Sequence, residues 1–197
     1  EGDEYDTAFW DKVPKFNPYH PADAILTSIE FDHADIYAVL AAVVRAFDGL
    51  LTRIRPGGRL IACLDYPAIG EMTARHAKEL ASKKITVTTY GSNPGTGARF
   101  TPSKIRVEGE MTCFSVLDGG KEVAQLELRL SGNHNVMNAL SVWIECRELG
   151  LKPEEFRAAL GSFHGVIRRQ EVRGEVRGVM VIDDFAHHPT AVRETLK

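Results

Sequence analysis

Apolar and polar residues follow a strand and helix alternation through the first half of the chain. Short apolar runs rich in β-branched residues, at 22–29, 59–64 and 85–90, are typical of buried strands. Between them, apolar residues recur at helical spacing over 35–54 and 72–82. Because strands joined by helical crossovers pair in parallel, this half predicts an α/β fold, a mostly parallel sheet with flanking helices.

The pattern changes after residue 97. Three short segments, 104–108, 111–117 and 123–130, have strand character, and in the last of them leucines alternate with polar residues. The Asp-Gly-Gly sequence at 118–120 is typical of a hairpin turn. We therefore expect a small antiparallel β extension added to the parallel sheet.

Two helices follow this extension. The first is predicted from residue 133 or 134 to 149, capped by Asn133 or the preceding Ser131 and ended by Gly150. The second covers 153–160 and has a proline in its first turn.

The end of the chain predicts the start of another domain. Residues 172–176 and 179–182 have the pattern of a hairpin around an Arg-Gly turn, and a helix begins at Pro189. We divide the chain into a central domain, 1–164, and the beginning of a C-terminal α/β domain, 165–197. A lone hairpin is marginal in water, so its apolar residues should dock on the central domain, pair with another chain or stay mobile.

Composition excludes several classes of function. The chain has 24 basic and 27 acidic residues, a net charge of -3 and no long run of one sign, so we expect no nucleic-acid and no membrane partner. No apolar run approaches the ~20 residues of a membrane helix, and no signal peptide opens the chain. We expect a cytoplasmic protein that binds small molecules, with no obligate protein partner evident.

The cysteines stand singly in apolar stretches, as buried reduced thiols do: Cys63, Cys113 and Cys146.

Four polar clusters are candidates for chemistry, at residues 1–6, 30–35, 132–138 and 183–190. The second and fourth follow a strand and precede a helix, where open α/β sheets bind ligands. Their carboxylates suit a nucleotide-bound Mg²⁺, although a solvated acidic loop or a helix cap would explain them as well. The double histidine of the last cluster lacks a well-spaced third ligand and does not favour zinc.

Two residue pairs leave alternatives open. Asn135 and Asn138 lie one turn apart near a helix N-terminus, which suits a nucleotide, and capping explains one asparagine better than two. Arg168 and Arg169 can clamp a phosphate or a carboxylate, or can lie in solvent, and their spacing does not decide between these roles.

In order along the chain, the clusters resemble the Mur ligase family: E-x-D-E-x-D, a D-H after a strand, G-x-H-N-x-x-N-A, R-R-x-E and D-D-x-x-H-H-P-T. The resemblance covers essentially the whole chain. EGDEYDTAFWDK, EFDHADIY and DDFAHHPTA are most similar to the branch that recycles murein peptide. The branch that adds L-alanine would more typically have Ser at Tyr5 and Tyr-Gly at Phe185 and Ala186. Gly2 and Trp10 depart slightly from the recycling pattern, which has Ala and Phe there.

The resemblance implies the central region of a three-domain, ATP-dependent amide ligase. Its small-molecule substrates would be UDP-N-acetylmuramate and the murein tripeptide L-Ala-γ-D-Glu-meso-diaminopimelate, and its cofactors would be ATP and Mg²⁺. ATP would phosphorylate the muramoyl carboxylate, and the amine of the peptide would attack the acyl phosphate. The alternatives are a ligase that uses L-alanine as the amine and a catalytically inert structural domain.

The resemblance also assigns roles by position. The metal ligands would be Glu1 and His33, with Asp3, Glu4 and Asp32 as weaker candidates around them. The nucleotide contacts from the central domain would be His134, Asn135 and Asn138. The contacts from the C-terminal side would be Arg169, Asp184 and His187. The residues with a catalytic role would be His33, Arg169 and Asp184.

Two features of the family are absent from the sequence. Several Mur ligases carry a carbamylated lysine downstream of the metal histidine, and residues 45–48 offer none, as in the muramate-ligase branch. No G-x-x-G-K-[ST] phosphate loop occurs either, and its normal place is upstream of Glu1. We therefore expect the intact protein to be a ligase and the chain alone to lack ATP turnover.

Overall fold

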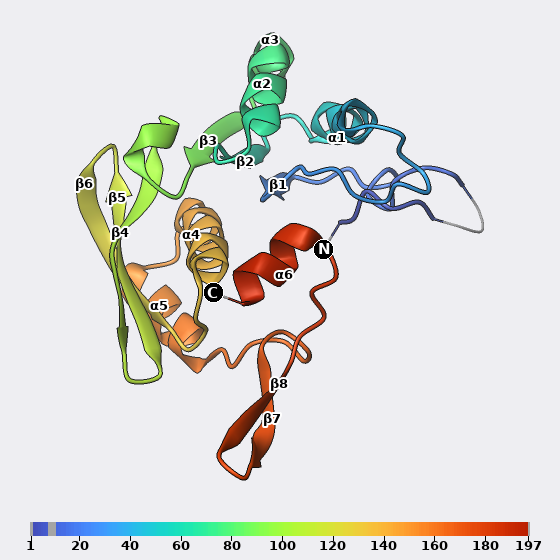
Figure 1. Cartoon of the computed structure of the whole chain (residues 1–197). Helices are drawn as coiled ribbons and strands as arrows, with labels where there is room; N and C mark the ends of the chain where they lie inside the picture. The colour runs from blue at the N-terminus through green and yellow to red at the C-terminus, as the bar shows by residue number, and fades with distance from the viewer. Residues whose placement is uncertain (1, 8–10, 197) are drawn as a thin grey trace. The chain divides into compact units, whose positions relative to one another are not determined.

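The computed structural model describes residues 2–7 and 11–196. The chain divides into two compact units, Glu1–Phe100 (unit 1) and Thr101–Lys197 (unit 2), and Figure 1 shows the elements of each. The domain boundary that the sequence places between residues 164 and 165 stays a prediction.

Unit 1 contains the predicted parallel sheet. Its strands are β1 (Asp23–Leu26), β2 (Arg59–Cys63) and β3 (Thr86–Tyr90), which pair in parallel in this order. The connecting helices are α1 (Leu40–Arg53), α2 (Pro67–Arg75) and α3 (Ala77–Ser82). Both crossovers move the same way across the sheet, so right-handed connections place these helices on one face, and Figure 1 shows them there. The β2 strand is buried from Leu60 to Cys63, whereas β1 is the first strand in the order and is buried only at Leu26.

The helix predicted over 35–54 begins only at Leu40. His33 has a left-handed backbone with φ 54°, and its carbonyl accepts the backbone N–H groups of Ile36 and Tyr37. These bonds close a turn instead of starting a helix. The prediction of the helix was therefore right, but its start was wrong by one turn and a half.

The helix predicted over 72–82 is in fact two helices. It starts earlier, with Pro67 at the first helical position, and it breaks at His76. The His76 ring contacts Asp48 of α1 (Nε2 to Oδ1, 2.8 Å) and Glu79 of α3 (Nδ1 to Oε2, 3.3 Å). A tertiary contact thus accompanies the break between α2 and α3. The hydrophobic pattern of the sequence reveals neither the contact nor the break.

The predicted antiparallel extension is confirmed. β4 (Phe100–Glu108) pairs with β3 through Phe100 and Tyr90, and the strand order continues through β5 (Met111–Asp118) to β6 (Lys121–Leu128). β5 and β6 are antiparallel, with Asp118 opposite Lys121 across the predicted turn. The sheet is therefore mixed, mostly parallel at its β1 end and antiparallel at β6.

Two helices follow in unit 2, as predicted: α4 (Asn133–Glu148) and α5 (Pro153–Ser162). Val136, Leu140 and Ile144 are fully buried on α4, which makes it the core helix of this unit. The predicted side-chain cap is wrong, because the N-cap is Gly132 and no side chain among the described residues caps the helix.

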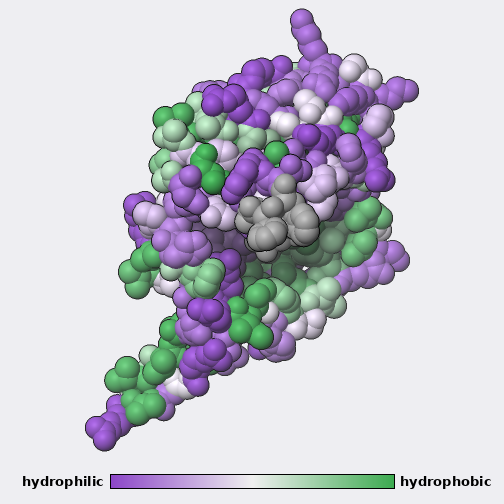
Figure 2. All heavy atoms as spheres, turned by 90° about the vertical axis from the view of Figure 1, so that its right-hand side faces the viewer, coloured by the Kyte–Doolittle hydropathy of each residue, from purple (hydrophilic) through white to green (hydrophobic). Residues whose placement is uncertain are grey.

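The C-terminal hairpin is confirmed as β7 (Glu171–Val176) and β8 (Val179–Asp183), followed by α6 (Pro189–Thr195). In the part of the chain that the structure describes, β7 and β8 pair only with each other. The large apolar side chains of the hairpin are 47% to 65% exposed: Val172, Val176, Val179, Met180, Val181 and Ile182. Figure 2 shows green spheres among purple ones on the hairpin, at the lower end of the view. The hairpin therefore buries little of its apolar surface.

Two further expectations concern the whole chain. Cys63 and Cys113 are buried as predicted, whereas Cys146 is only partly buried. Across the described residues, no helix combines the length and the apolar character that crossing a membrane requires.

Candidate functional site

Three metal-type ligands converge in unit 1. Asp3, Glu4 and His33 each offer one ligand atom, and these atoms lie within 4.8 Å of one another. His33 Nε2 is 3.7 Å from Asp3 Oδ1 and 3.9 Å from Glu4 Oε1. The two carboxylates are the kind of ligand that Mg²⁺ prefers and the imidazole adds a nitrogen donor, so these residues would suit a divalent cation such as the Mg²⁺ that the sequence implies. We call this group the Asp3–Glu4–His33 cluster.

The turn after β1 directs the His33 side chain toward the carboxylates of Asp3 and Glu4. The left-handed backbone of His33 is uncommon for a residue with a Cβ and costs free energy, which the surrounding structure must offset. The backbone N–H of His33 donates to Asp32 Oδ1 at 2.7 Å. Asp32 therefore supports the turn and is not one of the three converging ligands.

The N-terminal segment brings the two carboxylates to the turn by folding back on itself. The Lys15 N–H donates to the carbonyls of Asp3 and Tyr5, at 3.1 and 3.0 Å. Phe16 is 2% exposed, and its ring centroid lies 5.1 Å from that of Phe47 on α1. This buried aromatic pair anchors the segment on unit 1.

The surroundings of Asp3 favour its charged form. Burial opposes ionisation, but the Lys15 ammonium, 2.8 Å from Oδ2, and the Tyr5 N–H lower the pKa of Asp3 below its ordinary value. The Tyr37 hydroxyl donates to the carbonyl of Glu4 at 2.6 Å and holds that residue from the other side. The cluster is thus tied to both the N-terminal segment and the turn after β1.

The structure locates only part of the predicted metal site. Glu1 lies outside the described residues, so His33 is the one member of the predicted pair that can be placed. Asp3 and Glu4, the weaker candidates, are the residues that lie beside it. The motifs alone indicate no role at the metal for Tyr5, which falls within the first motif, or for Lys15, which lies three residues beyond it.

The predicted nucleotide contacts of the central domain lie at the start of α4 in unit 2. Buried His134 Nδ1 has no hydrogen-bond partner within the described chain. Its ring lies against Gly132, where an added Cβ would be 2.7 Å from Cε1, and the backbone φ of +91° at this position favours glycine. The side-chain amide of Asn135 donates to the Ser131 carbonyl at 2.7 Å, and Asn138 is exposed. An unsatisfied imidazole nitrogen at a helix N-terminus is a feature that a polar ligand could use.

The predicted C-terminal contacts lie around the β7–β8 hairpin, also in unit 2. Asp184 accepts the backbone N–H of Ala186 at 2.7 Å and that of Gln170 at 2.8 Å. Burial opposes its charge, but these two N–H groups and the charge of Arg169 lower the pKa of Asp184 below its ordinary value. Arg169 and His187 are both exposed. Asp184 thus ties the loop that carries Arg169 to the connection between β8 and α6.

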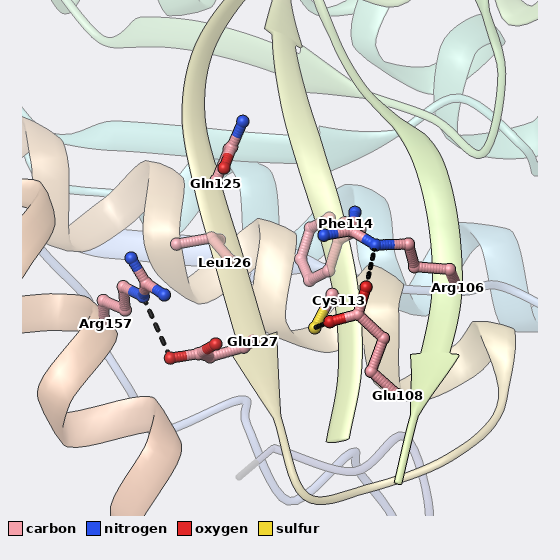
Figure 3. Close-up of a pocket in the computed structure, with 8 residues that line it drawn as sticks. All are labelled: Arg106, Glu108, Cys113, Phe114, Gln125, Leu126, Glu127 and Arg157. Carbon is pink, nitrogen blue, oxygen red and sulfur yellow. Dashed lines mark hydrogen bonds and ion pairs between the residues drawn. The ribbon is translucent and has the colours of Figure 1, made fainter.

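A small cavity in unit 2 is separate from these residues. It has a volume of about 130 Å³ and lies over β4, β5 and β6 beside α5, as Figure 3 shows. Arg106 pairs with Glu108, and Arg157 Nε lies 3.0 Å from Glu127 Oε1. These ion pairs neutralise the charges of its wall, and the predicted ligands are not among the described residues that line it.

The fold and the cluster together define a class of protein. A mostly parallel sheet with a histidine and carboxylate centre beyond its first strand is an α/β domain suited to a metal-bound ligand. More specifically, residues 11–145 match the family model of the Mur ligase middle domain, and the chain belongs to the Mur ligase family.

Curated relatives of both branches match the chain equally well. A UDP-N-acetylmuramate–L-alanine ligase of Acidothermus cellulolyticus is 36% identical over 100% of the chain, which covers 39% of that protein. The Escherichia coli UDP-N-acetylmuramate–L-alanyl-γ-D-glutamyl-meso-2,6-diaminoheptandioate ligase is 38% identical over 100% of the chain and 40% of that protein. The chain therefore spans about two fifths of the length of these relatives.

A solved structure agrees with this assignment. The murein peptide ligase of Psychrobacter arcticus has a TM-score of 0.69 and 31% identity over 100% of the chain and 38% of that structure. The predicted α/β fold and the resemblance to the family are confirmed. Mur ligases are ATP-dependent amide ligases of peptidoglycan synthesis, and the similar identities leave the two branches unresolved.

Proposed function

We propose that the chain is part of an ATP-dependent ligase that joins the tripeptide L-Ala-γ-D-Glu-meso-diaminopimelate to UDP-N-acetylmuramate. The observation that carries the proposal is the convergence of Asp3, Glu4 and His33 in a chain of this family. The choice of branch rests on the motifs, since Tyr5 and Phe185 stand where the alanine-adding branch more typically has Ser and Tyr.

The cluster suits the charge problem of this reaction. A carboxylate oxygen of UDP-N-acetylmuramate would attack the γ-phosphorus of ATP, and ADP would leave. The amine nitrogen of the peptide would then attack the acyl carbon, and phosphate would leave as the amide forms. Mg²⁺ supplies charge neutralisation at the phosphoryl oxygens. His33 would hold the cation, with Glu1 as the proposed second ligand and Asp3 and Glu4 beside it.

The remaining assignments are proposals for contacts with ATP. His134, Asn135 and Asn138 would present polar side chains at the start of α4, where the buried Nδ1 of His134 supports a ligand role. Arg169 would stabilise negative charge on the transferring group, with Asp184 and His187 as further contacts.

The test compares two amines on the full-length protein that contains this chain. With UDP-N-acetylmuramate, ATP and Mg²⁺, we expect ADP release with the tripeptide and little with L-alanine. The reverse preference would assign the protein to the alanine-adding branch. ADP release with neither amine would reject the ligase proposal.

The role of His33 is tested in the same assay. His33→Ala should lower kcat by at least about a hundredfold, as expected when transition-state electrostatics are lost, and should change Tm only modestly. Near-normal turnover, or loss of the fold, would instead indicate that His33 serves the turn after β1 and not the reaction.

A further inference from the structure

Tyr5 contacts the proposed metal ligand His33 directly. The ring centroids of the two residues are 4.5 Å apart, with 52° between the ring planes. The Tyr5 hydroxyl donates to Asp35 Oδ2 at 2.8 Å, and Lys15 Nζ lies 5.2 Å from the centroid of the Tyr5 ring. The Tyr5 side chain is therefore held by its ring and by its hydroxyl.

The two ends of Tyr5 reach the same turn. Asp35 lies two residues after His33, in the turn closed by the bonds to the His33 carbonyl. The ring thus rests on the imidazole while the hydroxyl is fixed to the backbone segment that carries it. An imidazole on a surface turn otherwise rotates about its side-chain torsions, and an aromatic neighbour restricts that rotation.

The resulting orientation turns a ring nitrogen of His33 toward the carboxylates. His33 Nε2 faces the carboxylates of Asp3 and Glu4. The aromatic ring and the carboxylates belong to one short segment, residues 3–5, and the Lys15 N–H holds this segment through the carbonyls of Asp3 and Tyr5. The ring that restrains the imidazole and the carboxylates that face it therefore move together.

We propose that Tyr5 is a positioning residue that holds the His33 imidazole toward Asp3 and Glu4 and so prepares the cluster for a divalent cation. The inference rests on the proposed metal centre. Residues that orient a metal ligand without binding the metal typically contribute about 10- to 100-fold in metal affinity. Tyr5 acts through packing and through its bond to Asp35, so the ring should contribute more than the hydroxyl.

The experiment measures Mn²⁺ binding to the chain by electron paramagnetic resonance. We expect Tyr5→Ser to raise the dissociation constant for Mn²⁺ by about tenfold or more. Tyr5→Phe, which keeps the ring, should raise it by only a few fold. Tyr19→Ser is the matched control, because Tyr19 is a tyrosine that is 53% exposed and has no place in the cluster. It should bind Mn²⁺ as the parent chain does.

A second readout separates the inference from the metal proposal. In the metal-free chain, the ring protons of His33 should shift in the NMR spectrum on Tyr5→Ser and stay nearly unchanged on Tyr5→Phe. Equal Mn²⁺ affinity of the parent chain and Tyr5→Ser would overturn the role of Tyr5. Absence of His33-dependent Mn²⁺ binding in the parent chain would overturn the metal centre, even where the NMR contact holds. If Tyr5→Ser fails to fold, Asp35→Asn replaces it as the test, because it weakens the bond to the Tyr5 hydroxyl and keeps the ring. Asp35→Asn should weaken Mn²⁺ binding, but less than His33→Ala does. Unchanged Mn²⁺ binding in Asp35→Asn would contradict the proposal.

Discussion

The packing of the N-terminal segment is tested by Phe16→Ala. Phe16 is 2% exposed and its ring contacts Phe47 of α1, whereas the segment is otherwise held by hydrogen bonds such as those of Lys15, Tyr5 and Tyr37. Removing the ring should therefore loosen the segment that carries Asp3 and Glu4.

The expected cost follows from burial. Truncating a buried phenylalanine to alanine costs about 3 to 5 kcal/mol, because transfer free energy is lost and a cavity remains. The aromatic pair contributes about 0.5 to 1.5 kcal/mol of this. A short segment at the edge of a unit can collapse into the space more easily than a central strand can. We therefore expect a loss of about 3 kcal/mol for the packing of the segment.

Native-state hydrogen exchange of the α1 amides, together with urea unfolding, measures this loss. Phe163→Ala is the control, because Phe163 is 45% exposed and its truncation should cost less than about 1 kcal/mol. Mn²⁺ affinity should fall together with the stability of the segment in Phe16→Ala. A loss below about 1 kcal/mol would refute the argument that Phe16 anchors the cluster on unit 1.

Three further predictions concern unit 2. Because the pKa of Asp184 is lowered in the folded chain, its carboxylate stabilises the fold above the ordinary pKa of 3.8, and this stabilisation is lost as the pH falls through the folded pKa. Hydrogen-exchange protection of the backbone N–H groups that Asp184 binds should therefore decrease in that pH range in the parent chain but not in Asp184→Asn. Gly132→Ala should lower unfolding stability by about 1 to 2 kcal/mol, because φ is +91° and the Cβ meets His134, whereas Gly161→Ala, with open space around it, should not. Val181→Lys, at a side chain that is 47% exposed, should leave Tm nearly unchanged and reduce any self-association seen by analytical ultracentrifugation.

The sequence predicts the elements well where burial decides them. β2 is a continuous apolar run from Leu60 to Cys63, and a run of this kind is buried on both faces of a parallel sheet. β6 alternates, and α4 carries its core residues at helical spacing. In these segments the local pattern and the tertiary packing require the same conformation.

The errors arise where a specific polar contact decides the backbone. The apolar spacing of Val39 and Leu40 favours a helix that starts early, yet both residues are exposed and the turn at His33 delays the start. The break at His76 coincides with a contact of its ring with Asp48, which is 28 residues away in the sequence. Hydrophobic periodicity contains no information about either contact.

The sequence predicts which residue types form the candidate site, but not which side chains and backbone groups contact one another there. The motif identifies His33, and the structure adds Asp3 and Glu4, which the sequence treats as secondary. The sequence places Asp184 at the nucleotide, and in the structure its two oxygens accept backbone N–H groups from both ends of the β7–β8 hairpin, those of Gln170 and Ala186. Such contacts between a side chain and the backbone depend on the folded conformation of the loops, and the order of residues in the sequence does not reveal them.

Position 5 bears both on the question of branch and on the geometry of the proposed metal centre. A tyrosine there spans the distance from the His33 ring to Asp35, whereas a serine, as in the pattern of the alanine-adding branch, is too short to make both contacts. A chain with serine at this position must restrain the imidazole by another group or leave it freer to rotate. If Tyr5 positions His33, Tyr5→Ser should weaken the metal centre without changing the choice of amine in the full-length protein. A switch of amine preference from the tripeptide to L-alanine in that single variant would show that residue 5 acts on the substrate instead of on the metal ligand.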